Sequence, residues 1–354
     1  MASNRFARPA RWLAAVAVLA AAFTLVPASA GQASPNLTLD QVKARVSQLQ
    51  NEAEIANEKA QVADIHVQQT QRHLDQVERQ LSAQKARLDK LSAQMGAYAA
   101  AMYANGGIDP SVQLMLSDNP SDFLAQAASL DQVARIQDSA FREARSAGLQ
   151  MAATQAQVDQ QLAKLQELQK EADANRAQVN TKLAESKALL SKLTAAQQRR
   201  LAAQQAARNA TASQSSRGSN PGSSGGSTYT PPPAGSGRGA IAVAYAMAQV
   251  GKAYVYGGTG PSSYDCSGLT MMAWAQAGVS LPHSASVQYA MTPRVALSDL
   301  QPGDLVFFYS DIHHVGMYIG GGNFVNAENP SVGIRVQSLY DPYWQSVYVG
   351  GGRV

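Results

Sequence analysis

The sequence predicts an all-α antiparallel coiled-coil hairpin at residues 31–208, followed by an α+β domain at residues 239–354. Apolar residues that recur every three or four positions over four heptads predict the hairpin. Two helical runs followed by several short strand-like runs predict the α+β domain. A stretch rich in Ser, Gly and Pro at residues 209–238 has the composition of a flexible linker between the two.

Residues 1–30 have the pattern of a signal peptide. Three arginines precede the apolar run WLAAVAVLAAAFTLV, and the small residues Ala28-Ser29-Ala30 follow it. The apolar run is about 15 residues long, whereas a membrane span requires about 20, although a retained anchor is the alternative. We therefore expect an exported, secreted protein.

The charge of the chain does not indicate a nucleic-acid partner. The chain has 29 Lys+Arg against 25 Asp+Glu, and three of the arginines (Arg5, Arg8 and Arg11) lie in the predicted signal peptide. Without that segment the basic and acidic residues are almost equal in number. We expect no binding of nucleic acid from this composition.

Two segments of the predicted hairpin carry an apolar seam. Each long helix would have one apolar stripe, and the other helix is the nearest partner for it, so an antiparallel pair follows. Residues 39–102 as one helix would extend about 100 Å. The seam residues are Leu74, Val77, Leu81, Leu88, Leu91, Met95, Tyr98 and Met102 in the first helix, and Val158, Leu162, Leu165, Val179, Leu183, Leu190 and Leu193 in the second.

The tip of the predicted hairpin, near residues 104–128, differs in composition from the helices. Asn105-Gly106-Gly107 and Asp109-Pro110 interrupt the first helix, and a short helical piece, FLAQAASL, precedes the return helix. An apolar cluster in this tip has two interpretations, a local core or a docking surface for another protein.

The α+β domain begins with the helical run AIAVAYAMAQVG, which ends at Gly251. The loop YVYGGTGPSSYD leads to a second helical run, CSGLTMMAWAQAG, which ends at Gly278. Strand-like runs follow: DLVFFYS, HVGMYIG, NFVNA, GIRVQS and SVYVGGGRV.

Cys266 is the single cysteine of the chain, so it forms no intramolecular disulfide. It follows a turn and begins a helix, whose free N–H groups and dipole would lower the pKa of a thiol. A small buried hydrophobic residue is the alternative. No metal and no cofactor is expected, because one Cys and few His give no plausible zinc set.

Strand alternation separates His314 from the core. Val315, Met317 and Ile319 share the natural core face of HVGMYIG, whereas His314 lies on the other face, towards a cleft with small neighbours. Asn326, twelve residues later, could orient the imidazole and complete a Cys-His-Asn arrangement, or be an ordinary turn residue.

From Ala240 onward the sequence resembles the NlpC-type peptidases, a papain-like superfamily of peptidoglycan hydrolases. The resemblance covers about a third of the chain. At Asn326 it departs from many members, which have His there, although Asn, Gln and Glu also occur. The matching motifs are YVYGG at 254–258, DCSGL at 265–269, LPHSASVQ at 281–288, GDLVFF at 303–308 and HVGMYIG at 314–320.

The resemblance implies a papain-like fold and an endopeptidase that cleaves peptidoglycan stem peptides, usually between γ-D-glutamate and the following diamino acid. Cys266 would attack the scissile carbonyl, His314 would transfer the proton, and Asn326 would orient His314. Asp265 as a plain helix cap is the alternative to a role in binding. The residues that the resemblance assigns to substrate binding are Tyr254, Asp265, Ser267 and His283.

The tip sequence MYANGGIDPSVQLMLSDNPSDFLAQAASL resembles the tips of coiled-coil hairpins on division- and elongation-associated wall hydrolases. Those hairpins dock on FtsX, the membrane component of an ABC-transporter-like complex, so the resemblance implies an FtsX-like partner. We expect the hairpin to regulate the hydrolase by covering its cleft. Two alternatives stay open: a wall-binding scaffold or recruitment protein, and an amidase or acyltransferase of the same superfamily.

Overall fold

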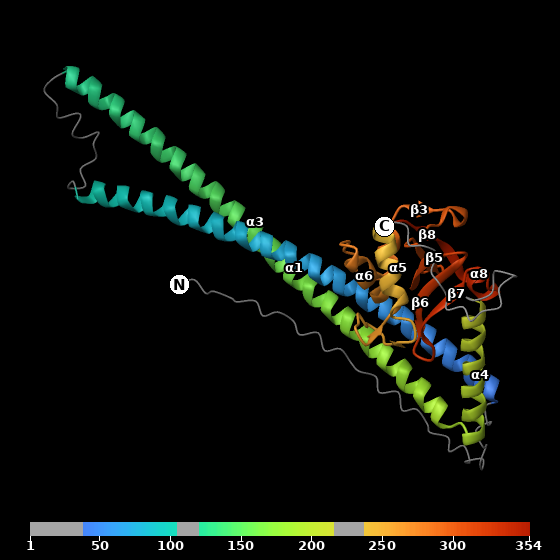
Figure 1. Cartoon of the computed structure of the whole chain (residues 1–354). Coiled ribbons are helices and arrows are strands. Elements are labelled where there is room, and N and C mark those ends of the chain that lie inside the picture. Colours follow the sequence, from blue (N-terminus) through green and yellow to red (C-terminus); the bar gives the residue numbers. More distant parts are fainter. Residues whose placement is uncertain (1–37, 105–119, 216–236) are drawn as a thin grey trace, which may run out of the picture. The chain divides into compact units, whose positions relative to one another are not determined.

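The computed structural model describes residues 38–104, 120–215 and 237–354. The predicted signal peptide, residues 105–119 of the predicted tip and residues 216–236 of the predicted linker lie outside the described residues. Among the described residues, three helices precede the α+β domain: α1 (Leu39–Ala104), α3 (Pro120–Ser191) and α4 (Ala195–Ser215) (Figure 1). Among the described residues, no helix is both long enough and apolar enough to cross a membrane.

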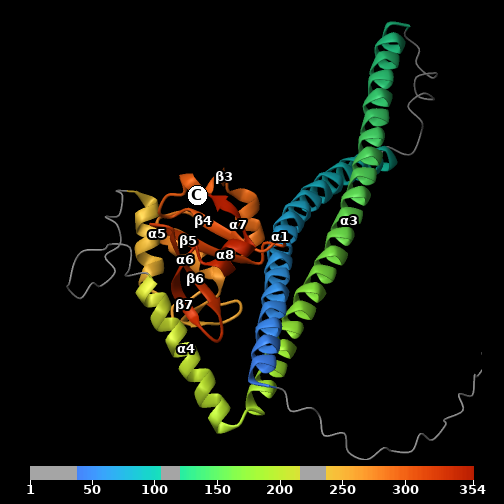
Figure 2. The same cartoon turned by 90° about the vertical axis from the view of Figure 1, so that its right-hand side faces the viewer.

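Helices α1 and α3 lie side by side over much of their length (Figures 1 and 2). One apolar cluster contains Leu74 of α1 with Val158 and Leu165 of α3, and another contains Val42 with Leu193, just beyond α3. Because residues later in α1 meet residues earlier in α3, the two helices are antiparallel. The predicted pairing of two long helices is therefore confirmed.

One position of the predicted seam is wrong. Leu162 is 40% exposed, whereas Val158 and Leu165 are buried. The partly buried residue between them is Gln161. Between Val158 and Leu165 a heptad can place its seam residue either three positions on, at Gln161, or four positions on, at Leu162. The prediction chose Leu162 because it is apolar, but the helix turns Gln161 inward.

The ends of the long helices also differ from the prediction. A single helix, α3, starts at Pro120, where a short helical piece and a separate return helix were expected. After Ser191 the chain turns, and Thr194 and Gln197 begin α4 by exchanging side-chain-to-backbone hydrogen bonds in a capping box. Residues 209–215, assigned to the linker from their composition, are the last part of α4.

The α+β domain has an antiparallel six-stranded sheet in the order β3-β8-β4-β5-β6-β7. Its strands are β3 (Arg294–Val295), β4 (Leu305–Phe308), β5 (His314–Gly320), β6 (Asn323–Asn329), β7 (Gly333–Ser338) and β8 (Tyr348–Gly352). The remaining elements are α5 (Arg238–Met247), the parallel pair β1 (Ala253–Tyr254) and β2 (Ser263–Tyr264), α6 (Cys266–Gln276), α7 (Ala285–Met291), η1 (Leu297–Asp299) and α8 (Pro342–Val347). Helices followed by an antiparallel sheet match the predicted α+β fold.

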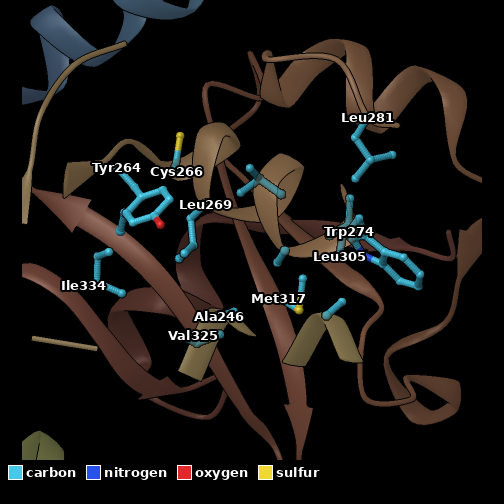
Figure 3. Packing of buried hydrophobic residues seen from close by; sticks show 14 of the residues in the cluster. Ala246, Tyr264, Cys266, Leu269, Trp274, Leu281, Leu305, Met317, Val325 and Ile334 are labelled. Atoms are coloured by element: carbon cyan, nitrogen blue, oxygen red, sulfur yellow. The ribbon is translucent and has the colours of Figure 1, made fainter. Parts of the chain in front are cut away.

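Alternation along the strands gives the sheet two apolar faces. In the larger cluster, Val315 and Met317 of β5 pack together with Leu269 and Trp274 of α6 (Figure 3). Cys266 lies at the margin of this cluster, with its sulfur pointing away from Leu269 (Figure 3). The smaller cluster is aromatic and covers the opposite face; its buried members are Val306, Phe308, Phe324, Leu339 and Trp344.

Candidate active site

Cys266 is the first residue of α6, directly after the N-cap Asp265. The Asp265 carboxylate accepts a hydrogen bond from the Gly268 N–H at 2.7 Å, which satisfies one of the free donors at the helix start. The preceding turn contains Gly257, whose φ of +72° favours glycine and whose N–H donates to Asp265 at 2.9 Å. Asp265 therefore caps the helix that carries the cysteine.

His314 begins β5 and is held by Asn326 of β6. The Asn326 amide nitrogen donates to Gln337 Oε1 at 3.0 Å, which directs the amide oxygen towards His314 Nε2 at 3.1 Å. An oxygen can only accept, so Nε2 carries the proton of this bond. Cys266 Sγ lies within 4.8 Å of a ring nitrogen of His314.

The surroundings of His314 differ from the predicted cleft with small neighbours. Its ring stacks on Trp344, with ring centroids 5.5 Å apart, and lies 5.8 Å from the ring of Phe308. His314 is 1% exposed. The strand alternation is as predicted, but the face away from the main core is covered by a second, aromatic cluster that includes α8.

Helix α1 supplies a carboxylate to this site. Glu54 Oε1 lies 2.5 Å from His314 Nδ1. One ligand atom each of Glu54, Cys266 and His314 lies within 4.8 Å of the others, and all three residues are buried. The Cys266 thiol donates to the His313 carbonyl at 3.7 Å. A third chemical group, from a helix about two hundred residues earlier, therefore joins the predicted Cys-His pair.

Two further polar residues of α1 reach Asp265. Asn57 donates to Asp265 Oδ2 at 3.1 Å, and Gln61 donates to the same oxygen at 2.5 Å. Gln61 Oε1 also accepts from the Ser267 hydroxyl at 3.2 Å. His283 Nε2 lies 2.8 Å from Asp265 Oδ1 and 2.9 Å from Gln61 Nε2. Three residues predicted to bind substrate therefore contact one another and α1.

Glu58 of α1 is held by the start of α7. One carboxylate oxygen accepts from the Ser284 hydroxyl at 2.5 Å and from the Ser286 hydroxyl at 2.7 Å. Backbone N–H groups of Ala285 and Ser286 donate to the carboxylate at 3.0 and 2.9 Å. Glu58 is 6% exposed, so these four bonds replace its hydration.

Comparison with known proteins identifies the domain that bears this site. Residues 251–353 match the model of the NlpC/P60 family. The "Probable endopeptidase p60" of Listeria seeligeri is 45% identical over 114 residues, which are 32% of this chain and 21% of the relative. Residues 251–353 are an NlpC/P60 domain.

Two further matches concern the same part of the chain. A "Probable endopeptidase" of Mycobacterium tuberculosis (strain ATCC 25618 / H37Rv) is 45% identical over 116 residues, which are 33% of this chain and 30% of the relative. The chain thus spans between 21% and 30% of the length of these two curated relatives. The solved NlpC/p60 domain of the peptidoglycan hydrolase SagA is 30% identical, with a TM-score of 0.30, and covers 33% of this chain and 98% of that one.

The acidity of the Cys266 thiol differs from the prediction in this arrangement. Burial, followed by the negative charges of Glu54, Asp265 and Glu58, raises the pKa of the thiol well above its usual range. The N–H of Val315 acts in the opposite direction but is outweighed. The helix start is in place, yet α1 excludes water and adds carboxylates, so the sulfur is held as a thiol.

His314 is biased towards its charged form by the same helix. Burial lowers the pKa of His314, but the charge and hydrogen bond of Glu54, followed by the hydrogen bond of Asn326, raise it above its usual value. In contact with α1 the domain therefore favours a protonated His314 beside a protonated Cys266. Cysteine nucleophiles react as thiolates, so the protonated sulfur opposes the reaction.

Tyr254 is the one predicted binding residue without a polar contact among the described residues. Its hydroxyl is buried and has no hydrogen-bond partner there. Burial, followed by the charges of Glu54 and Cys266, raises its pKa well above the usual value, so the ring lies near both groups. A buried hydroxyl without a partner beside a reactive sulfur is available to a ligand.

The structure brings all seven predicted site residues of the NlpC/P60 domain to one region, but the sequence analysis missed the contribution of α1. Polar residues recur on one helical face there, and small Ala residues at 53, 56, 60 and 63 occupy the face towards α3. The burial of the polar residues depends on contacts with the distant domain, so the sequence of α1 alone carries no signal of it. The α1 residues that contact the domain through their side chains are named the inhibitory face, after the role proposed for them below: Asn51, Glu54, Asn57, Glu58 and Gln61.

Proposed function

We propose that this protein is a cysteine endopeptidase that hydrolyses the peptide stems of peptidoglycan. The observation that carries the proposal is Cys266 at the start of α6, within 4.8 Å of an imidazole whose other nitrogen is held by Asn326. This is the nucleophile, base and orienting group that thiol acyl transfer needs. The endopeptidase names of the curated relatives support the same reaction class.

The reaction proceeds in two steps once α1 has left the site. The Cys266 thiolate attacks the scissile carbonyl carbon, and His314 donates its proton to the leaving amine as the C–N bond breaks. His314 then takes a proton from water, whose oxygen attacks the acyl-enzyme and releases the carboxylate product and the thiol. The Cys266 N–H and the unpartnered Tyr254 hydroxyl are the donors available to the oxyanion.

We assign the scissile bond to the link between γ-D-glutamate and the following diamino acid, from the resemblance of the motifs. We propose export on the basis of the pattern of residues 1–30, and a place in the cell wall on the basis of the proposed substrate. An FtsX-like partner for the hairpin tip stays a prediction, because residues 105–119 lie outside the described residues.

We further propose that α1 inhibits the enzyme by occupying its substrate site. The inhibitory face contacts Asp265, Ser267 and His314, and with it in place Cys266 is 2% exposed. A stem peptide cannot reach a sulfur that is covered in this way. The polar character of the contact suits a reversible inhibitor, because polar groups exposed on separation are rehydrated.

Muropeptide mass spectrometry tests the proposed function. The full chain with Glu58→Ala and Gln61→Ala, which weakens the α1 contact, is incubated with purified peptidoglycan. We expect new products that end in γ-D-glutamate, and none when Cys266→Ala is added. Wall binding without any cleaved product would instead indicate a scaffold protein, and products cut at the amide of the sugar lactyl group would indicate an amidase.

A further inference from the structure

Three chemically different metal-binding side chains converge where α1 meets the NlpC/P60 domain. The Cys266 sulfur, a ring nitrogen of His314 and a carboxylate oxygen of Glu54 all lie within 4.8 Å of one another. Their exposed fractions are 2%, 1% and 7%, so water does not separate them freely. A thiol, an imidazole and a carboxylate are the ligand types of tetrahedral zinc sites.

The imidazole is already oriented for coordination. Nε2–H donates to the Asn326 amide oxygen, so Nδ1 lies on the side of Glu54, and its proton leaves when a metal ion replaces the hydrogen bond to Glu54. A metal-binding histidine almost always donates its other ring N–H to an oxygen in this way. Asn326 would thus serve a bound metal as it serves the free imidazole.

The distance between the Glu54 and His314 ligand atoms must increase slightly before the two can bind one zinc ion. Tetrahedral zinc holds ligand atoms roughly 3–4 Å apart, since each lies about 2.0–2.3 Å from the metal. Glu54 Oε1 and His314 Nδ1 are now 2.5 Å apart because they share a hydrogen bond. A side-chain rotation of Glu54 that widens this distance by about 1 Å is enough.

The Tyr254 hydroxyl is a further buried polar group at this place. It is buried without a hydrogen-bond partner among the described residues, and the charges of Glu54 and Cys266 act on it. A water molecule in the fourth position of a zinc ion would be a hydrogen-bond donor for it, as three-ligand zinc sites commonly hold one.

We propose that the NlpC/P60 domain and α1 together bind one Zn²⁺ through Cys266, His314 and Glu54, and that this ion holds α1 on the site. The inference goes beyond hydrolysis of peptidoglycan, and metal binding tests it without any measurement of activity.

Charge and ligand type both favour zinc over other common divalent ions. A thiolate and a carboxylate neutralise the two positive charges of the ion. Mg²⁺ and Ca²⁺ prefer oxygen ligands, whereas sulfur and imidazole suit zinc. The NlpC/P60 domain alone offers two of the three ligands, so the ion binds best when α1 is in place. An ion that binds one of two arrangements stabilises that arrangement.

Calorimetric titration of the full, reduced chain with ZnCl₂ tests the site, with binding of Co²⁺ followed by its absorption spectrum. We expect one Zn²⁺ per chain and a sulfur-to-cobalt charge-transfer band. Glu54→Gln should weaken zinc binding by more than about tenfold, because the loss of an outer partner alone costs about 10- to 100-fold. Glu78→Gln, an exposed position of the same helix, is the matched control and should bind zinc as the wild type does.

Glu54→His separates coordination from general loosening of α1. It removes the carboxylate but supplies an imidazole, so zinc binding should recover relative to Glu54→Gln. No stoichiometric binding by the wild type would overturn the proposal. Equal zinc affinity of Glu54→Gln and the wild type would overturn it too, and so would equally weak binding by Glu54→His and Glu54→Gln.

Hydrogen exchange tests whether the ion holds α1. Zn²⁺ should slow amide exchange at residues 51–61 of the wild type and have no effect there in Cys266→Ala. Slowing of the same size in Cys266→Ala, or no slowing in the wild type, would show that zinc does not join α1 to the domain.

Discussion

Replacement of Glu58 by Ala should release α1 and activate the full chain. Glu58 is the inhibitory-face residue with the largest number of hydrogen bonds, since its carboxylate accepts from two hydroxyls and two backbone N–H groups at the start of α7. It lies outside the Cys266–His314 pair, so its removal leaves the proposed chemistry intact. All four bonds join α1 to the NlpC/P60 domain, so they are lost only when the two separate.

The size of the effect follows from the burial of this charge. Truncating one partner of a buried hydrogen-bonded charge costs about 2–5 kcal/mol. The donors left behind are backbone and hydroxyl groups that water can reach once α1 moves, which favours the low end of that range. Since each 1.4 kcal/mol is tenfold, the open fraction should rise about 30-fold. The rate rises by the same factor until the open form predominates.

The assay is release of soluble fragments from purified peptidoglycan by equal amounts of wild type, Glu58→Ala and Glu58→Gln, with a chelator present throughout. Lys59→Ala, an exposed position of the same helix, is the matched control. We expect Glu58→Ala to be fastest, Glu58→Gln intermediate, and Lys59→Ala equal to the wild type. If Glu58→Ala is no faster than Lys59→Ala while circular dichroism shows it folded, α1 does not limit access to the site.

Three other outcomes are expected. In the Glu58→Ala background, Cys266→Ser should lower the rate of peptidoglycan hydrolysis by at least about 10³-fold, as loss of a nucleophile does in other covalent enzymes. A smaller loss in the same assay would show that Cys266 is not the nucleophile. Asn326→Ala in that background should lower kcat by about 10–100-fold because the imidazole loses its orientation, and an unchanged kcat would contradict that role. Leu165→Ala should lower the free energy of unfolding, measured by urea titration, by about 2–5 kcal/mol, whereas Leu162→Ala should change it by no more than about 0.5 kcal/mol. Equal losses for the two variants would contradict the observed register.

The α+β domain could be predicted because its local patterns and its packing agree. Strand alternation placed Val315, Met317 and Ile319 in the main cluster, where they lie. The helix start at Cys266 was evident from the turn, and Asp265 forms the helix cap that was the alternative to its role in binding. The aromatic cluster around Trp344 was not foreseen, because α8 is a six-residue helix and a short helix has a weak periodic signal.

The contribution of α1 could not be predicted from periodicity. Glu54, Glu58 and Gln61 are ordinary residues of a solvated helix face, and their burial depends on a contact with residues more than two hundred positions later. The same contact reverses the predicted acidity of Cys266, which was derived from the helix start alone. Local sequence therefore indicated which groups are reactive, whereas long-range packing determines their protonation.

The proposed inhibition by α1 restricts how the enzyme could be activated. The inhibitory face and a stem peptide would contact the same groups, Asp265, Ser267 and His314, so their binding is mutually exclusive. A tethered segment acts at an effective concentration in the millimolar range, which dilution of the protein does not change. Soluble peptide at lower concentration should therefore not displace α1, and neither should dilution. If α1 inhibits as proposed, activation needs a change that acts on the contact itself, such as a force or a binding partner on the α1–α3 pair, or loss of the proposed zinc ion.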